Sequence, residues 1–204
     1  SMQHYSFAVE AFMKLAREFA LEDFELAVHE TKTSEVIENV HNHRSELGIL
    51  YLNDFNRKAM QKIFAENDLE FTELFQCDVY VYLSNHHPLA GRDKITFEEL
   101  GDYPCLSFEQ GDKNSFYFAE EVFSTLQYKQ MIKADDRATM LNLMVGMNGY
   151  TLCSGIICEE LNGDGYSAIP LETDEKMTIG YIKRKGMHIS HIGKSYIEIL
   201  RGYA

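Results

Sequence analysis

Apolar residues recur along this chain with two different periods. One apolar stripe has the period of a helix and consists of Ala8, Phe12, Leu15 and Phe19. It predicts an amphipathic helix over Phe7–Ala20, with Ser6 as the cap. A continuous apolar run predicts a strand over Leu47–Leu52 that is buried on both faces. Helical and extended patterns alternate in this way to the end of the chain, which predicts an α/β fold of mainly parallel sheets with helices on both faces.

The other elements follow from the same two patterns and from the turn residues between them. Helices are predicted at Thr33–Val40, with Thr33 or Ser34 as the cap, and at Arg57–Phe64, Phe116–Leu126, Met140–Met147, Ile157–Leu161 and His188–Leu200. Strands are predicted at Phe24–Glu30, Phe71–Leu83, Gln130–Ala134, Tyr150–Cys153, Tyr166–Leu171 and Met177–Lys183. At 204 residues, the chain is long enough for one large domain or two small lobes.

The segment near the middle of the chain carries the most specific local signals. Val79–Leu83 has the pattern of a buried strand, and Pro88 ends its pairing because proline has no N–H to donate to a sheet. Thr96 and Glu99 have the spacing of a capping box, in which each side chain accepts a hydrogen bond from the backbone N–H of the other residue. Cys105–Phe108 then returns to an extended, apolar pattern. The segment therefore predicts a strand, a connection, a short helix and a second strand.

This segment, Ser84–Phe108, resembles the one with which LysR-type transcriptional regulators leave the first half of their effector-binding domain and enter the second. The resemblance rests on His87-Pro88-Leu89-Ala90, on Ile95-Thr96 followed by Glu98-Glu99-Leu100, and on Tyr103-Pro104. It implies two Rossmann-like lobes of mainly parallel sheet flanked by helices, joined by two crossover segments as in type 2 periplasmic binding proteins. Lobe I would comprise residues 1–83 and 184–204, and lobe II residues 84–183. The resemblance also implies that the family's N-terminal winged helix-turn-helix DNA-binding domain is absent from this sequence.

The resemblance further implies that a small-molecule effector binds in the cleft between the lobes. In an open α/β sheet, the helix N-termini that follow the strands present unpaired N–H groups and suit small anions. The candidate effector-binding residues in these loops are Gln3, His4, Tyr5, Ser6, Thr31, Thr33, Ser34, Ser107, Phe108, Gln110, Arg137 and Thr139. Arg137 is suited to pair with a carboxylate, and His4 and Tyr5 to supply a hydrogen bond and a stacking face. For each residue taken alone, the alternative is a helix cap, a surface cation or a frayed terminus.

Charge and cysteine content narrow the class of partner. The formal net charge is −13, and no basic cluster is longer than Lys183-Arg184-Lys185. Binding of nucleic acid by this chain is therefore not expected, because it requires several cations that neutralise phosphates. The four cysteines form no Cys-x-x-Cys pair and lie in apolar stretches, which indicates reduced packing thiols in the cytoplasm. No apolar run is long enough to predict a membrane span.

Several polar clusters are interpreted without assigning them chemistry. The pairs His41 with His43 and His86 with His87 lack the helical spacing and the third ligand of a metal site, so neither a metal nor another cofactor is predicted. Glu120 and Glu121 are interpreted as part of a solvated helix face, because adjacent residues of a helix point in different directions.

The hypothesis favoured by these observations is the effector-sensing and dimerisation domain of a LysR-type regulator. It would bind a small polar or anionic metabolite and form a homodimer, possibly a tetramer at full length, with DNA bound only through the absent domain. The predicted helices Phe7–Ala20 and Phe116–Leu126 are the candidate interface elements. One alternative is a stand-alone solute-binding protein of the same fold. The other is a two-lobe α/β enzyme, which is disfavoured because the sequence has no Gly-x-Ser-x-Gly, P-loop, Rossmann or His-Glu-x-x-His motif.

Overall fold

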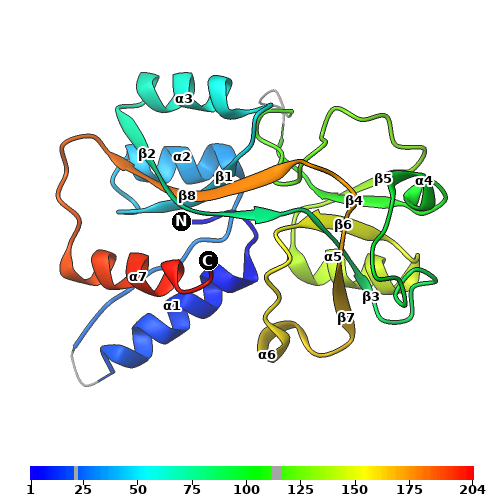
Figure 1. Ribbon diagram of the computed structural model, residues 1–204. Helices are drawn as coiled ribbons and strands as arrows, with labels where there is room; N and C mark the ends of the chain where they lie inside the picture. Colours follow the sequence, from blue (N-terminus) through cyan, green and yellow to red (C-terminus); the bar gives the residue numbers. More distant parts are fainter. Residues whose placement is uncertain (21–22, 112–115) are drawn as a thin grey trace. The chain divides into compact units, whose positions relative to one another are not determined.

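The chain forms two compact units. A computed structural model describes residues 1–20, 23–111 and 116–204 (Figure 1). The first unit is built from Ser1–Gln76 together with Thr178–Ala204, and the second from Cys77–Met177. The chain therefore leaves the first unit within strand β2 (Leu69–Asp78) and returns to it within strand β8 (Lys176–Arg184).

Both points at which the chain crosses between the two units lie earlier in the sequence than was predicted. The predicted boundaries followed Leu83 and Lys183, whereas the units divide after Gln76 and after Met177. The difference arises from strand pairing. Strand β3 (Tyr80–Ser84) pairs with β6 and β7 of the second unit, and β8 pairs with β1 of the first.

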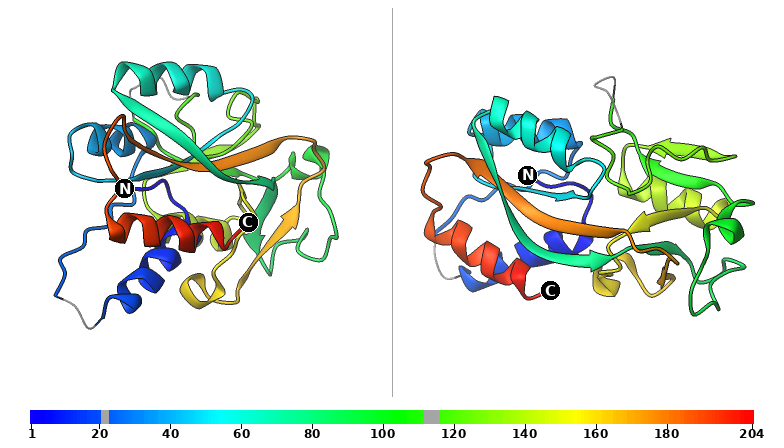
Figure 2. Two further views of the ribbon diagram at one scale, coloured as in Figure 1. Left: turned by 60° about the vertical axis from the view of Figure 1, so that its left-hand side comes forward. Right: turned by 45° about the horizontal axis from the view of Figure 1, so that its top comes forward.

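The first unit contains a three-stranded sheet in the order β1-β8-β2, in which β1 (Gly48–Leu52) and β8 run antiparallel. All five residues of β1 are buried, as the sequence predicted. Helices α2 (Thr33–His41) and α3 (Arg57–Glu66) cover one face of this sheet, and α1 (Ser6–Glu18) and α7 (His191–Arg201) cover the other (Figures 1 and 2). The strand is continuously apolar because helices lie on both of its faces.

Helices α1 and α7 pack side by side in the first unit. The Tyr196 hydroxyl of α7 donates a hydrogen bond of 2.8 Å to the carbonyl of Ala8 in α1, and the rings of Tyr196 and Phe12 meet edge to face. The predicted caps of α1 and α2 are wrong. The N-cap residues are Tyr5 and Lys32, neither with a side-chain cap hydrogen bond, and Ser6 and Thr33 are the first helical residues.

The predicted strand at Phe24–Glu30 is also wrong, because only Glu30 makes a bridge, to Met2. Phe24 is 44% exposed and Val28 is 41% exposed, so the alternating apolar residues of this segment do not line a core. The short N-terminal stretch takes the place of a strand. Met2 forms parallel bridges to both Glu30 and Ile49 and is almost fully buried.

The second unit contains a five-stranded sheet in the order β5-β4-β6-β3-β7. Its strands other than β3 are β4 (Cys105–Phe108), β5 (Met131–Ala134), β6 (Tyr150–Cys153) and β7 (Tyr166–Pro170), and its helices are α4 (Phe97–Leu100), α5 (Arg137–Gly146) and α6 (Glu159–Asn162). β4 runs parallel to β5 and β6, whereas β3 runs antiparallel to β6 and β7. The prediction of mainly parallel sheets is thus corrected to mixed sheets. A run of apolar residues reports burial but not strand direction.

Two different layers cover the faces of the second sheet. Helix α5 packs on one face, where Leu106, Met140 and Met144 form a buried cluster. The residues at 116–130 border the other face of β4 and β5 with turns instead of the predicted helix Phe116–Leu126. Phe123 has a φ of 61°, which no α-helix permits. The helix prediction is therefore wrong at this position.

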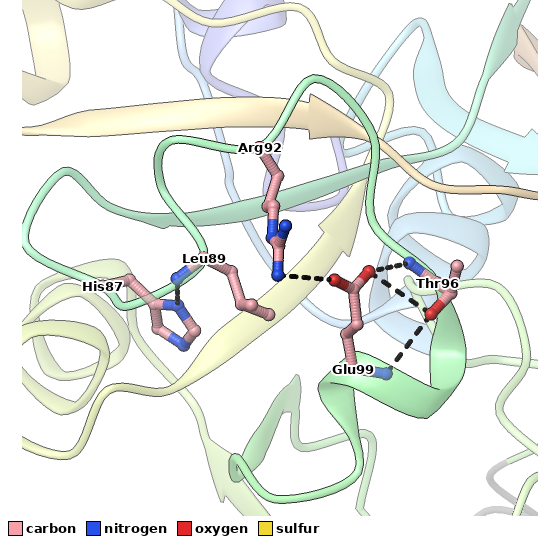
Figure 3. A network of polar contacts seen from close by, with 5 residues as sticks. All are labelled: His87, Leu89, Arg92, Thr96 and Glu99. Atoms are coloured by element: carbon pink, nitrogen blue, oxygen red, sulfur yellow. Dashed lines mark hydrogen bonds and ion pairs between the residues drawn. The ribbon is translucent and has the colours of Figure 1, made fainter.

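The crossover segment has the local structure that its sequence predicted (Figure 3). The Thr96 hydroxyl accepts a hydrogen bond from the Glu99 N–H, and the Glu99 carboxylate accepts one of 3.0 Å from the Thr96 N–H, so the capping box of α4 is confirmed. The other carboxylate oxygen of Glu99 pairs with the Arg92 guanidinium at 3.3 Å.

Buried His87 anchors the start of the same segment. Its Nδ1 accepts a hydrogen bond of 3.0 Å from the N–H of Leu89 (Figure 3), and its Nε2 lies 3.0 Å from the carbonyl of Asn148. Accepting at Nδ1 requires the tautomer with a proton on Nε2. Burial lowers the pKa of His87, which keeps the ring neutral.

Candidate functional site

In the first unit, three predicted effector residues form one buried hydrogen-bonded network around Gln3. The Gln3 amide nitrogen donates to the Thr33 hydroxyl at 2.6 Å, and its oxygen accepts from the Tyr5 hydroxyl at 3.0 Å and from the Tyr51 N–H at 3.1 Å. Gln3 and Thr33 are each 1% exposed. These contacts join the N-terminal stretch to α2 and β1, so the network stabilises the unit and leaves Thr33 inaccessible to a ligand.

The other predicted residues of the first unit lie around this network and are partly accessible. His4 precedes α1 and Ser6 begins it, and both are half-buried. Thr31 is half-buried and its hydroxyl donates to the Glu35 carboxylate, while Ser34 lies half-buried in the first turn of α2. Of the predicted residues of this unit, the accessible ones are therefore His4, Ser6, Thr31 and Ser34.

In the second unit, the end of β4 is held by a carboxylate that the sequence did not indicate. The Ser107 hydroxyl donates to Glu121 Oε2 at 2.8 Å, and the Phe108 N–H donates to Glu121 Oε1 at 3.0 Å. Both predicted residues are half-buried, whereas Glu121 is only 6% exposed. One buried side chain thus fixes a side-chain hydroxyl and a backbone N–H of the candidate loop.

A second buried carboxylate lies next in sequence. Glu120 is 4% exposed and accepts a hydrogen bond of 2.8 Å from the amide nitrogen of Gln110, the third predicted residue of this loop. The interpretation of Glu120 and Glu121 as a solvated helix face is therefore wrong. Two adjacent side chains point into the protein here because the chain forms turns rather than a helix.

The environment of Glu121 disfavours its charged form. Burial, followed by the nearby charge of Glu120, raises the pKa of Glu121 from 4.5 to about 7, against the opposing effect of the hydrogen bonds from Phe108 and Ser107. A cavity of about 70 Å³ lies beside Glu121, with Tyr128 and Lys133 among its lining residues. This volume holds a few water molecules but no metabolite.

The start of α5 contributes the last two predicted residues. Asp136 caps the helix by accepting a hydrogen bond of 2.9 Å from the N–H of Thr139. Thr139 is exposed and Arg137 is half-buried at the first helical position. The first residue of α5 is thus an arginine, and a guanidinium and a helix N-terminus each favour an anion.

A larger cavity of about 310 Å³ belongs to the first unit. Its lining comes from α1, α7 and the segments 25–28 and 44–47, with Ser1 and Met2 at one side. No predicted effector residue is among the residues that line it. This cavity is therefore separate from the candidate loops.

The cysteines are free thiols in poorly reactive surroundings. All four belong to the second unit. Burial raises the pKa of Cys77 and of Cys105 to about 12, and that of Cys153 to about 11. Because the thiolate is the nucleophile, these three side chains are inert at neutral pH.

Two further findings concern the described residues as a whole. In residues 1–20, 23–111 and 116–204, no three His, Cys, Asp or Glu side chains gather into a group that would hold a metal ion. Over the same residues, no helix has the length and apolar content needed to cross a bilayer.

The chain is thus an α/β protein of two units, and comparison with known proteins gives its family. Residues 4–204 match the family model of the LysR substrate binding domain, so the chain belongs to this family. The family is a domain of transcriptional regulators. The resemblance inferred from the crossover segment is therefore confirmed.

One curated relative supports the same assignment. The malolactic fermentation system transcriptional activator of Lactococcus lactis subsp. lactis (strain IL1403) is 27% identical over 137 residues, which are 65% of this chain and 46% of that protein. The chain thus spans about half the length of this relative.

Solved structures share the fold at low sequence identity. The effector binding domain of QuiR in complex with shikimate has a TM-score of 0.63 and 17% identity, covering 99% of this chain and 93% of that one. The reduced form of OxyR has a TM-score of 0.66 and 18% identity, covering 99% and 92%. HinK, a LysR family regulator from Pseudomonas aeruginosa, has a TM-score of 0.67 and 15% identity, covering 98% and 68%. The predicted α/β fold of the type 2 periplasmic binding protein kind is thus confirmed.

Proposed function

We propose that this chain is the effector-sensing domain of a LysR-type transcriptional regulator, and that it binds a small polar or anionic metabolite. The observation that carries the proposal is the family match over residues 4–204. In such a regulator, the effector shifts a balance between conformations, and a separate DNA-binding domain reports the shift. The domain itself is proposed to bind and not to catalyse. A regulator of this kind acts in the cytoplasm, where the DNA is.

The second unit supplies the best-supported effector contacts. Arg137 and Thr139 lie at the N-terminus of α5, a helix of ten residues, and Ser107 lies at the end of β4. A guanidinium, two hydroxyls and a helix N-terminus together favour a ligand with a carboxylate and further polar groups. The complex of QuiR with shikimate supports this chemical class, because shikimate is a small hydroxylated acid.

Thermal-shift measurements with a library of small acids, hydroxy acids and amino acids, shikimate included, test the proposal. A ligand that binds only the folded state at a concentration 100 times its Kd adds about 2.7 kcal/mol of stability. For a chain of this size, that gain raises the melting temperature by roughly 5–11 °C. If no compound of these classes stabilises the protein, a small-acid effector is excluded.

Variants locate the site of any ligand found in this way. Arg137→Ala and Ser107→Ala are expected to reduce the shift strongly, whereas Lys94→Ala removes an exposed cation of the same unit and leaves the shift unchanged. A ligand whose shift is the same in all three variants binds away from the candidate loops of the second unit. Thr33 is unsuitable for such a test, because its burial means that a larger side chain there disrupts the first unit.

We also propose that the domain forms a homodimer through the edge of the second sheet. Strand β5 ends that sheet, and the exposed apolar side chains of Phe116, Leu126 and Met131 belong to β5 and the turns before it. An exposed strand edge with apolar residues favours pairing with another chain. By contrast, the buried residues of α1 pack within the first unit against α7, which makes α1 the weaker of the two interface candidates.

Sedimentation velocity over a range of concentrations tests this interface. Met131→Lys is expected to shift the protein towards the monomer, because a charge on the strand edge opposes pairing. Met147→Lys changes another exposed methionine of the same unit and is the matched control. A wild-type protein that stays monomeric at high concentration, or equal effects of both variants, would contradict a β5 interface.

A further inference from the structure

The side chain of Glu121 links two groups of the candidate loop at the end of β4. Its two oxygens accept separate hydrogen bonds, one from the Ser107 hydroxyl at 2.8 Å and one from the Phe108 N–H at 3.0 Å. Since the Ser107 proton points to Glu121 in this arrangement, the Ser107 oxygen has only lone pairs left for any other group. Ser107 is thereby an acceptor towards a ligand.

We propose that Glu121 is a positioning residue that sets the hydrogen-bond polarity of Ser107, making the hydroxyl an acceptor towards the effector when the carboxylate is ionised and a donor when it is protonated. This inference rests on the proposed function, because it concerns the same loop. It goes beyond that function by adding a residue that touches no ligand and yet determines which ligand atoms suit the site.

The change of polarity follows from the proton count. A carboxylate has acceptors only, so Ser107 must donate to it. When a proton from solvent binds to Oε2, the carboxyl group donates to the Ser107 oxygen, and the serine proton turns away from Glu121. Oε1 continues to accept from the Phe108 N–H. The protonated state therefore offers a donor to a carboxylate or carbonyl of the effector, and the ionised state offers lone pairs to an N–H or O–H.

Several titratable groups surround Glu121. Glu120 adds a like charge that favours the protonated form, and Lys133 lines the same cavity. Cys105 and Tyr128 also face this cavity, and burial raises the pKa of each, of Cys105 to about 12, so both stay neutral across the physiological range. Burial of Glu121, with the charge of Glu120, brings its own pKa to about 7.

Nuclear magnetic resonance of the ligand-free protein tests the proposal. The Glu121 side-chain carboxyl carbon, the Ser107 β-carbon and the Phe108 amide are expected to shift together with pH, with one midpoint near 7. In Glu121→Gln the Ser107 and Phe108 signals lose this transition. Glu98→Gln changes an exposed carboxylate of the same unit and leaves the midpoint unaltered.

Two further variants move the midpoint in opposite directions and keep the test valid if Glu121→Gln fails to fold. Glu120→Gln removes the like charge and lowers the midpoint, whereas Ser107→Ala removes a hydrogen bond to the ionised form and raises the Phe108 midpoint, in each case by about one pH unit. A wild-type Glu121 that titrates below pH 5, or Phe108 signals that respond identically in wild type and Glu120→Gln, would overturn the proposal. No ligand is used, so these outcomes are independent of whether the proposed effector class is right.

Discussion

Replacing Glu121 by glutamine is expected to stabilise the protein at alkaline pH but much less at acidic pH. Glutamine has the shape of the protonated carboxyl group, so its oxygen accepts from the Phe108 N–H and its amide donates to the Ser107 oxygen. The hydrogen bonds observed for Glu121 therefore persist with the roles reversed at Ser107. Only the buried charge is removed.

The magnitude follows from the pKa of Glu121, which rises from 4.5 to about 7 on folding. The folded protein thus holds this proton more tightly than the unfolded chain does. The stability contributed by the protonated group is complete below pH 4.5 and is lost as the pH rises through about 7. Each pKa unit corresponds to about 1.4 kcal/mol, so the ionised carboxylate lowers the free energy of unfolding by about 3 kcal/mol above pH 8.

Urea denaturation at pH 5 and pH 8 measures this contribution. Circular dichroism and the fluorescence of the 12 tyrosines report unfolding, since the chain has no tryptophan. The difference in unfolding free energy between Glu121→Gln and wild type is expected to grow by about 2–3 kcal/mol from pH 5 to pH 8, with an unchanged m-value. At pH 8 the variant should melt roughly 6–12 °C higher.

Taking the difference between variant and wild type removes the contributions of all other titrating groups. Glu98→Gln, at an exposed site, is the control and should show no pH-dependent difference. A gap between Glu121→Gln and wild type that is equal at both pH values would refute the reasoning, because it would mean that Glu121 is ionised throughout this range.

Three other outcomes are expected from single changes. Burial lowers the pKa of His87, so below about pH 6.5 the unfolded chain binds a proton at this residue more readily than the folded protein does. The free energy of unfolding of wild type should therefore fall with pH below about 6.5. Urea denaturation of His87→Gln should not show this decrease. Gly180→Ala would place a Cβ 2.3 Å from the ring of Phe71 and should lower the free energy of unfolding by more than 2 kcal/mol, while Gly146→Ala, with open space around the new methyl group, should change it by less than about 1 kcal/mol. Buried Cys105 should react with a disulfide reagent only at the rate of unfolding, and rapid labelling of the native protein would show that its thiol is accessible.

The elements that could be predicted from sequence are those whose structure depends on residues close together in the chain. The capping box of Thr96 and Glu99 depends on two residues three positions apart, and the burial of β1 on its own apolar run. By contrast, the antiparallel direction of β3 depends on strands far away in the chain. The apolar residues at 24–28 had a strand pattern, but no partner strand lies beside them among the described residues.

The candidate site shows the same division. The loops before α1, α2 and α5 and after β4 were chosen as candidates because a polar residue follows or precedes a predicted element. The accessibility of each residue could not be predicted, since Thr33 is buried by Gln3 and Thr139 is exposed. Glu121 was missed because acidic residues are usually solvated, and its inward position depends on Ser107 and Phe108, more than ten positions earlier.

The position of β8 at the centre of the first sheet determines the order in which the protein can assemble on the ribosome. β1 and β2 are not neighbours, because β8 lies between them, and β8 is the last strand in the described part of the chain. Every strand of the second sheet comes from one uninterrupted stretch, Cys77–Met177, which is synthesised before β8 is complete. The first sheet therefore cannot be completed until β8 has been synthesised, which is after all the strands of the second sheet.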